Sequence, residues 1–151
     1  MPEPEPQPNP LFTLFDEIGI IGQLTRAMIE ARMPQGILAS QFAVLNHLVR
    51  VRDGRSPLEL ARAFQVPKTT MTHTLAKLEK HGLIRQAPNP DDGRSKCIWL
   101  TEAGAAFRLT TIAALGPDFT ALTQRIPVED LTALLPTLTR LRQTLDDLRS
   151  G

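Results

Sequence analysis

The stretch SPLELARAFQVPKTTMTHTLAKLEKHGLI, residues 56–84, contains the start and stop signals of two helices separated by a short turn. Ser56 can cap the first helix, and Glu59 completes a capping box. This first helix must be short, because Pro67 cannot continue it. Gly82 supplies a closing residue for the second helix. A short helix, a tight turn and a second helix make up a helix-turn-helix.

The second helix, about residues 68–81, is polar on one side. By 100° steps, Met71, Leu75 and Leu78 form one narrow buried stripe, and the opposite face carries hydroxyl and basic groups. Hydroxyls bond phosphates or base edges, and lysine neutralises phosphate. The alternative is a plain solvated face, but threonine is a weak helix former that such faces do not favour. We interpret this helix as a DNA-reading helix with these candidate contacts: Lys68, Thr69, Thr70, Thr72, His73 and Lys77.

A hairpin is predicted next. The segments LIRQA and KCIWL read as two short strands around the loop PNPDDGRS. We expect Gly93 to let the tip turn tightly, with Arg94 and Lys96 adding positive charge near it. A narrow A/T minor groove attracts an inserted arginine, whereas an incidental ion pair on an exposed hairpin would stabilise little. We expect Trp99 to pack within the wing or against the body of the domain.

The basic charge is concentrated in the middle of the chain. Residues 50–96 carry ten Lys and Arg against five Asp and Glu, a net charge of +5. The remainder carries seven against eleven, a net charge of −4, so the chain's total of +1 conceals the asymmetry. Such a distribution suits a polyanion, although charge alone fits a solvated face equally well.

Amphipathic helices are predicted on both sides of this region. Residues 11–33 and 39–51 have helical periodicity, and a helix after the hairpin ends before Gly116. A last helix over residues 128–148 carries leucines at steps of three and four, a heptad-like seam longer than one small domain needs. Pro136 interrupts this seam and can kink the helix.

Composition excludes several classes of protein. The 151 residues include one cysteine and no apolar run near the ~20 residues of a membrane span. The first ten residues alternate proline with polar or acidic residues, which predicts an extended tail and not a secretory signal. His47, His73, His81 and Cys97 have no metal-ligand spacing, and we find no catalytic triad or phosphate loop. We expect a cytoplasmic protein without a cofactor or enzymatic activity.

Three segments, in this order and spacing, resemble the MarR family of bacterial winged-helix transcription regulators: LASQFAVLNHL, LELARAFQVPKTTMTHTLAKLEKHGLI and PNPDDGRSKCIWLTEAG. The most specific part is Asp92-x-Arg94, an apolar strand, and then Leu100-Thr101-x-x-Gly104. The resemblance covers about residues 11–148. It implies a mainly α fold with a small β-hairpin wing, a winged helix-turn-helix with N- and C-terminal dimerisation helices. The implied division, within one domain overall, is a disordered tail (1–10), a dimerisation helix (11–36), the winged helix-turn-helix (37–100) and further dimerisation helices (101–151).

The resemblance also implies roles for individual residues. In the family, the terminal helices of two chains interlock into a homodimer, and each chain contributes one reading helix and one wing. Asp92 would help to orient Arg94, and Arg94 would enter the minor groove of double-stranded DNA. Two residues depart from the family pattern. Pro67 stands where many members have a side chain able to cap the reading helix, and His73 stands where a basic residue is common, so the charge there depends on pH.

We therefore predict a DNA-binding transcription regulator, a repressor in particular, that binds a pseudo-palindromic operator as a homodimer. The resemblance implies release by a small apolar or aromatic effector, bound between the dimerisation helices and the reading domain. Candidate walls of that pocket, each of which could instead be plain core, are Phe15, Met28, Phe42, Leu45 and His47. Two alternatives remain open: a winged-helix module for protein–protein contact without an operator, and a redox-sensing regulator that acts through Cys97.

Overall fold

The computed structural model describes residues 1, 9–34 and 36–151, so most of the predicted tail lies outside the described residues. The chain divides into two units, Met1–Ala114 and Leu115–Gly151. Its architecture is mainly helical with a two-stranded antiparallel hairpin, which confirms the predicted fold class. Among the described residues, no helix has the length and hydrophobicity that a membrane crossing requires.

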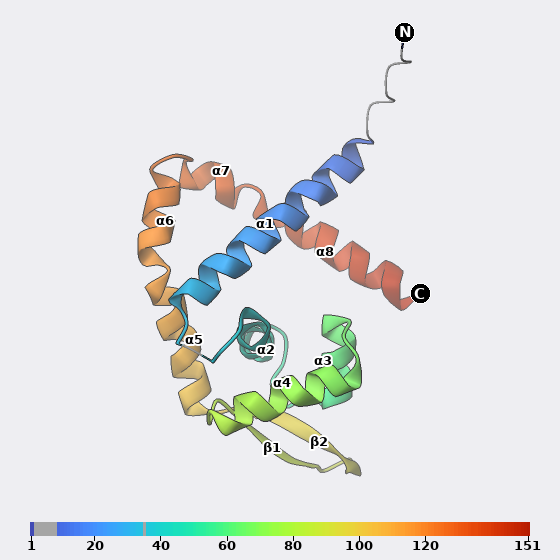
Figure 1. The fold of residues 1–151 in the computed structure, drawn as a ribbon. Coiled ribbons are helices and arrows are strands. Elements are labelled where there is room, and N and C mark those ends of the chain that lie inside the picture. The colour runs from blue at the N-terminus through green and yellow to red at the C-terminus, as the bar shows by residue number, and fades with distance from the viewer. Residues whose placement is uncertain (2–8, 35) are drawn as a thin grey trace. The chain divides into compact units, whose positions relative to one another are not determined.

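The first unit contains the predicted helix-turn-helix and hairpin. Its elements are α1 (Pro10–Arg32), α2 (Ala39–Arg50), α3 (Pro57–Phe64), α4 (Lys68–Lys80), β1 (Ile84–Asn89), β2 (Asp92–Leu100) and α5 (Glu102–Ala114). α3 packs against α4, and the hairpin of β1 and β2 follows directly from the end of α4 (Figure 1). The predicted ends of α1, α2 and α4 lie close to the observed ones.

The core of this unit lies where α2, α3, α4 and the hairpin meet. The predicted stripe of α4, Met71, Leu75 and Leu78, is buried there. The most completely buried side chains come from all of these elements: Val44, Leu45, Leu48, Leu60, Leu75, Leu78, Ile84 and Ile98. Burying a side chain of this kind contributes about 1.5–3 kcal/mol. The shared core therefore fixes the reading helix and the root of the wing in one body.

A serine cap starts α3. The Ser56 hydroxyl accepts a hydrogen bond from the Glu59 N–H at 3.1 Å, as predicted. The Glu59 carboxylate does not close the predicted capping box. It accepts hydrogen bonds from Arg52 and Arg55 at 2.8 and 3.0 Å instead, because these guanidinium groups are stronger partners than a backbone N–H.

A glycine ends α4, as the sequence predicts. Gly82 has a φ of +71°, and the Leu83 N–H donates to the Leu78 carbonyl oxygen at 3.0 Å. This left-handed residue turns the chain at once, so that β1 begins at Ile84. The wing therefore follows the reading helix with almost no intervening loop.

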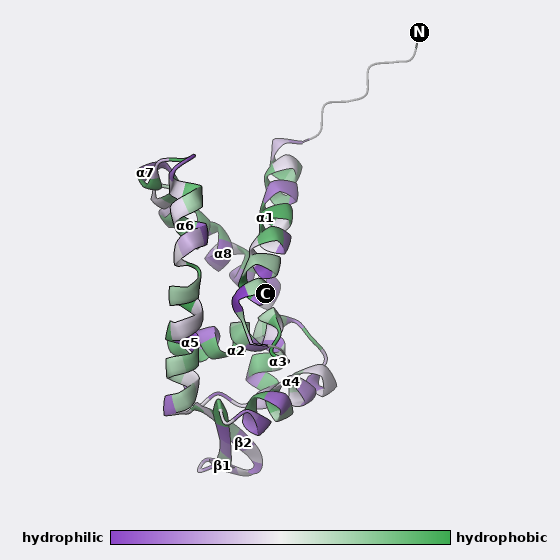
Figure 2. Ribbon diagram, turned by 60° about the vertical axis from the view of Figure 1, so that its left-hand side comes forward, coloured by the Kyte–Doolittle hydropathy of each residue, from purple (hydrophilic) through white to green (hydrophobic). Residues whose placement is uncertain are grey.

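α1 is a long apolar helix with little cover. It contacts α2 and α5, and Glu30 Oε1 accepts a hydrogen bond from the Ala39 N–H at the start of α2. None of its residues is buried. Hydrophobic residues recur along its length (Figure 2), and the exposed ones are Leu11, Phe12, Leu14, Phe15, Ile18, Ile20, Ile21 and Leu24. The predicted apolar stripe of this helix thus stays open to solvent in the single chain.

The second unit contains α6 (Gly116–Thr123), α7 (Val128–Thr132) and α8 (Leu135–Ser150), none of which has a buried residue. The sequence reasoning missed α6 and predicted one helix over residues 128–148. Pro117 and Pro136 both occupy the first turn of a new helix. Proline is favoured there because the missing N–H has no intrahelical partner in any case.

Candidate nucleic-acid interface

α4 presents a polar face opposite its buried stripe. The candidate contacts on this helix are all exposed: Lys68, Thr69, Thr70, Thr72, His73 and Lys77. Ala76 lies in the middle of this face, and its small side chain would let the helix approach a groove closely. Lys80 continues the face by one turn and is exposed. The sequence reasoning missed Lys80, although its spacing from Lys77 and His73 places it on the same face of the helix.

Two threonine hydroxyls of α4 bond the backbone of their own helix. Thr72 Oγ1 donates to the Lys68 carbonyl oxygen at 2.9 Å, and Thr74 Oγ1 donates to that of Thr70 at 3.1 Å. A hydroxyl bound in this way has used its proton but keeps lone pairs. Thr72 therefore offers a ligand an acceptor with a fixed orientation.

Pro67 precedes α4 and provides no side-chain cap. The first-turn N–H groups of residues 68–70 have no intrahelical partner, as in any helix. A helix N-terminus of this kind carries partial positive charge and suits a phosphate oxygen. Without a side-chain cap at Pro67, these amides stay open to an anion such as a phosphate.

The wing turns at Pro90 and Asp91, and the prediction that Gly93 forms the tip is wrong. Gly93 lies within β2 and does not have a positive φ. Proline is favoured in the first central position of a turn, and here Pro90 takes that place. Asn89 pairs with Asp92, but the next pair is Pro88 with Lys96. Residues 93–95 therefore bulge out of the ladder, and a bulge redirects the side chains it carries.

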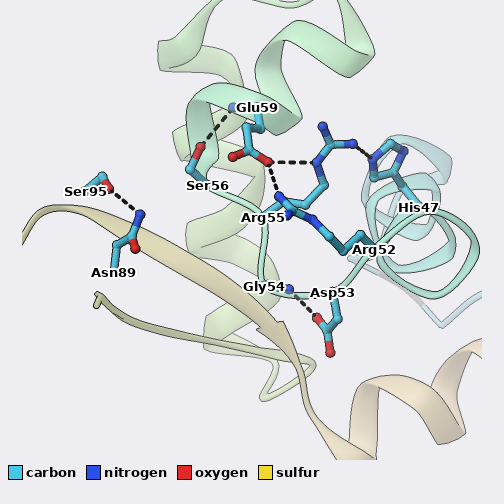
Figure 3. Close-up of polar contacts among 9 residues, drawn as sticks. All are labelled: His47, Arg52, Asp53, Gly54, Arg55, Ser56, Glu59, Asn89 and Ser95. Atoms are coloured by element: carbon cyan, nitrogen blue, oxygen red, sulfur yellow. Dashed lines mark hydrogen bonds and ion pairs between the residues drawn. The ribbon is translucent and has the colours of Figure 1, made fainter. Parts of the chain in front are cut away.

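Hydrogen bonds from neighbouring side chains hold this bulge. Asp92 Oδ1 accepts from the Arg94 backbone N–H at 3.0 Å. Asn89 Nδ2 donates to Ser95 Oγ at 3.1 Å (Figure 3), and Ser95 Oγ donates to the Asp92 carbonyl oxygen at 3.3 Å. The contact between Asp92 and Arg94 thus runs through the backbone, and the Arg94 side chain is exposed. Sequence reasoning missed Asn89 and Ser95, because their contact depends on the bulge.

The loop between α2 and α3 ties down the root of the wing. The Gly54 N–H donates to the Ile98 carbonyl oxygen at 2.9 Å, and the Ile98 N–H donates to the Arg55 carbonyl oxygen at 2.8 Å. Asp53 Oδ1 accepts from the N–H groups of Gly54 and Leu100 at 3.0 and 2.9 Å. The loop therefore acts as a short extra strand along β2 and anchors it to the body.

Trp99 packs against this same loop, as expected. A Cβ on Gly54 would lie 2.6 Å from the Trp99 ring, and Gly54 has a φ of +74°. Only glycine can adopt that conformation at so short a distance without strain. On β1, the Arg85 guanidinium lies 5.6 Å from the centre of the same ring, within range of a cation–π interaction. Trp99 thus marks the contact between wing and body.

A cluster of charged side chains lies next to this anchor: His47, Arg52, Arg55 and Glu59, which we call the Arg55 cluster (Figure 3). Burial, followed by the charges of Arg55 and Arg50, lowers the pKa of His47 below its usual value. The hydrogen bond from Arg55 lowers the pKa of the Glu59 carboxyl, with a further contribution from Arg52. Sequence reasoning missed Arg52, Arg55 and Glu59 as a group, and considered His47 only as a pocket residue.

A shallow groove of about 240 Å³ lies between α1 and α2. It is lined by Gly22, Thr25, Arg26, Ile29, Ala39, Phe42, Ala43 and Asn46. Of the predicted effector residues, only Phe42 is among them. Leu45 is fully buried in the core, Phe15 is exposed on α1, and His47 binds Arg55. Met28, half-buried on α1, is also outside the lining. The structure therefore does not bring the five residues together in one site.

An exposed polar helix beside a hairpin with an arginine at its bulge defines a winged helix-turn-helix protein. The sequence model of the MarR family matches residues 35–95. Wild-type MarR from E. coli in its apo form is similar, with a TM-score of 0.72 and 26% identity over 89% of this chain and 98% of that chain. A mutant E. coli MarR complexed with operator DNA matches with a TM-score of 0.67 and 26% identity, over 87% of this chain and 94% of that chain. A MarR transcriptional regulator from Methanosarcina mazei Go1 matches with a TM-score of 0.77 and 20% identity, over 90% and 98%.

The protein is therefore similar to MarR-family transcriptional regulators, in sequence over residues 35–95 and in fold over 89% of the chain. Members of this family are transcription regulators and not enzymes.

Proposed function

We propose that this regulator is a cytoplasmic repressor that binds a pseudo-palindromic operator as a homodimer and leaves it when a small effector binds. The observation that carries the DNA-binding part is the exposed polar face of α4 beside a wing with an exposed Arg94. α4 would enter the major groove, and Arg94 would enter the adjoining minor groove. Lys96 and the first-turn amides of α4 would bind phosphates. The likeness to an E. coli protein crystallised with operator DNA supports this reading.

Exposed apolar helices support the homodimer. On α1, Leu11, Phe12 and Leu24 are 61%, 66% and 65% exposed. On α8, the exposed leucines of the predicted seam are Leu138, Leu145 and Leu148. Large apolar side chains exposed along a helix in this way are costly on a monomer and usually mark an interface. A two-fold dimer would also place two reading helices about one DNA turn, roughly 34 Å, apart.

The groove between α1 and α2 is the place we propose for the effector, in place of the five residues inferred from the sequence. Its walls are mainly apolar, and Arg26 and Asn46 add polar groups. Such walls suit a small aromatic or amphipathic molecule. The ligand must bind a state with misaligned reading helices more tightly than the DNA-binding state, because otherwise it shifts nothing.

Two rival functions fit less well. A module for protein–protein contact would not need the net charge of +5 over residues 50–96. A redox regulator acting through Cys97 would need an accessible thiol, and Cys97 is buried, 8% exposed, opposite Ala87 of β1. Reactive cysteines lie in partly exposed, electropositive surroundings.

Salt dependence of duplex binding tests the proposed function. If α4 and the wing neutralise phosphates, the logarithm of the association constant should fall linearly with the logarithm of salt concentration, by about 0.9 for each phosphate. Fluorescence anisotropy with a labelled duplex selected by the protein from a random pool measures this slope. Binding that is indifferent to salt, or no duplex binding at low salt, would support the protein-contact rival instead.

A further inference from the structure

Arg55 connects three parts of the reading unit through different atoms. Its Nη1 donates to His47 Nε2 on α2 at 2.9 Å, and its Nε donates to Glu59 Oε2 on α3 at 3.0 Å. Its carbonyl oxygen accepts from the Ile98 N–H of β2 at 2.8 Å. The Arg55 side chain is only 22% exposed. One residue thus joins α2, α3 and the second strand of the wing (Figure 3).

The contact with Arg55 requires a neutral His47. A guanidinium group has donors only, so His47 must accept at Nε2 and carry its single proton on Nδ1. The ring is 8% exposed, and its centroid lies 5.3 Å from that of Phe64 on α3. Burial and the nearby Arg55 and Arg50 charges lower its pKa below 6.5, so this neutral form prevails at neutral pH.

The other charged groups around α2 bond different partners. Glu30 of α1 bonds the Ala39 N–H at the opposite end of α2, and Arg108 of α5 bonds Asn46 Oδ1. α4 and β2 contact α2 through buried apolar side chains. On α3, the Glu59 carboxylate is bound by Arg52 and Arg55. The charges that act on His47 are therefore those of Arg55 and Arg50.

We propose that Arg55 is a positioning residue that holds the wing at the angle needed for DNA binding, and that protonation of His47 releases this hold. The imidazolium form has two donors and no acceptor, and it would set two cations 2.9 Å apart. Arg55 must then move, and its backbone and that of Gly54 carry the bonds to Ile98. The inference rests on the proposed DNA-binding function, but the attachment of the wing exists without DNA.

The proposed release of the wing predicts a pH dependence of DNA affinity that is opposite to the ordinary electrostatic effect. Added positive charge normally strengthens binding to DNA. Here, acidification weakens it, because the wing loses its anchor. The Glu59 carboxyl keeps its charge as the pH falls toward about 5, because its pKa is lowered from 4.5.

The fluorescence of Trp99 reports directly on the contact between the wing and the loop that anchors it. The chain has one tryptophan and no tyrosine, and the Trp99 ring lies against Gly54. On acidification from about pH 7.5 to about pH 5, the emission of the wild type should shift to longer wavelength as the ring gains water, with a midpoint below the usual histidine value of about 6.5. His47→Gln keeps an acceptor for Arg55 but does not titrate, so its emission should stay constant.

His81→Gln is the matched control. His81 is exposed after the last turn of α4 and lies outside the Arg55 cluster, so this variant should keep the wild-type transition. Circular dichroism verifies that each variant is folded across the range. A transition that persists unchanged in His47→Gln, or no transition in the wild type, overturns the inference.

Arg55→Lys gives an independent answer if His47→Gln does not fold. Lysine keeps the charge, but it lacks the planar fork that binds His47 and Glu59 together, so the loop that bonds Ile98 loses its side-chain hold. Its emission near pH 7.5 should resemble that of the acidified wild type and should no longer respond to pH. A full wild-type transition in Arg55→Lys would show that Arg55 does not carry the effect.

Duplex binding forms the last arm, with the labelled duplex selected by the wild type. Affinity of the wild type should fall about fivefold or more relative to His47→Gln between the two pH values, the lower end of typical coupling between sites. Both proteins carry His73 and His81, so they differ only at position 47. Equal pH profiles would overturn the inference while leaving DNA binding intact. No duplex binding at any pH would overturn the proposed function, even if the Trp99 transition appears.

Discussion

Thr101 and Gly104 belong to the pattern that carries the family resemblance, and their role in the structure is packing. Thr101 Oγ1 donates to the Gly82 carbonyl oxygen at 2.6 Å and accepts from the Gly104 N–H at 3.0 Å. A Cβ on Gly104 would overlap the Leu83 carbonyl oxygen and lie 2.9 Å from Leu100 Cδ1. These contacts dock the start of α5 on the turn between α4 and β1. They keep the wing and the reading helix in a fixed relation.

Gly104→Ala should therefore destabilise the fold. The added methyl group meets backbone and not a flexible side chain, so the free energy of unfolding should fall by about 1–3 kcal/mol, as for other overpacked sites. Urea denaturation measures this loss. Gly116→Ala is the control, because a Cβ there meets nothing within 4 Å. Equal stability of the two variants would contradict the close approach at Gly104.

At the scale of residues, the sequence predicts those features that depend only on residues close together in the chain. The buried stripe of α4 and its glycine stop follow from periodicity and from one local conformation, and both are confirmed. The contact between His47 and Arg55 was not predicted, because it crosses a loop and depends on how that loop folds. The effector residues were chosen by helix and not by facing side chain. A groove needs the relative rotation of α1 and α2, which a linear pattern does not contain.

At the scale of elements, some features of the wing were predicted from the sequence and others were not. Its strands were predicted from their apolar residues, and the observed register pairs Ile84 with Leu100 and Ala87 with Cys97. The bulge at residues 93–95 was not predicted. The loop contains both Gly93 and Pro90 as possible turn residues, and only the pairing of Asn89 with Asp92 decides between them.

The wing also provides a prediction about DNA sequence. If Arg94 enters a narrow minor groove, Arg94→Ala should weaken binding mainly to duplexes with A/T-rich flanks, where the groove potential is most negative. Lys96→Ala, which removes a charge from the same strand, should weaken binding to all duplexes similarly. Anisotropy titrations with A/T-rich and G/C-rich flanks compare the two variants. An equal loss on both flanks for Arg94→Ala would reduce this residue to a phosphate contact.

Proline explains why the helix boundaries after residue 115 were predicted wrongly from the sequence. Gly116 and Pro117 were read as a stop, and Pro136 as a possible kink within one helix. Each proline instead lies in the first turn of a new helix. The same residue can end one helix and start the next, so its presence alone does not tell whether another helix follows.

At the scale of the whole molecule, apolar surface is distributed unevenly. The core formed by α2, α3, α4 and the hairpin is closed, whereas α1, α6, α7 and α8 contain no buried residue. The sequence reasoning anticipated this surplus from the leucine seam, although the seam could not show which partner covers it. Exposed apolar helices of this kind are consistent with the proposed homodimer, in which they would be covered.

Removing residues 127–151 should therefore leave an aggregated or unfolded chain. The deletion takes away α7 and α8, whose exposed apolar residues we expect to be covered in the proposed dimer. Circular dichroism and size-exclusion chromatography measure the outcome. A soluble, folded monomer after this truncation would contradict an interlocked dimer.

Charging α1 separates assembly from folding. Ile21 and Leu24 are 55% and 65% exposed in the single chain, so Ile21→Glu with Leu24→Glu adds little strain within it. In a dimer, the same carboxylates would be buried without partners, and each such charge costs several kcal/mol. The double variant should sediment as a monomer while keeping its helical circular dichroism, and its duplex affinity should fall because it no longer presents two reading helices together. Thr110→Glu, at another exposed position on α5, is the control for added charge. If the wild type is itself monomeric in sedimentation equilibrium, or if the double variant stays dimeric, then α1 is not the assembly surface.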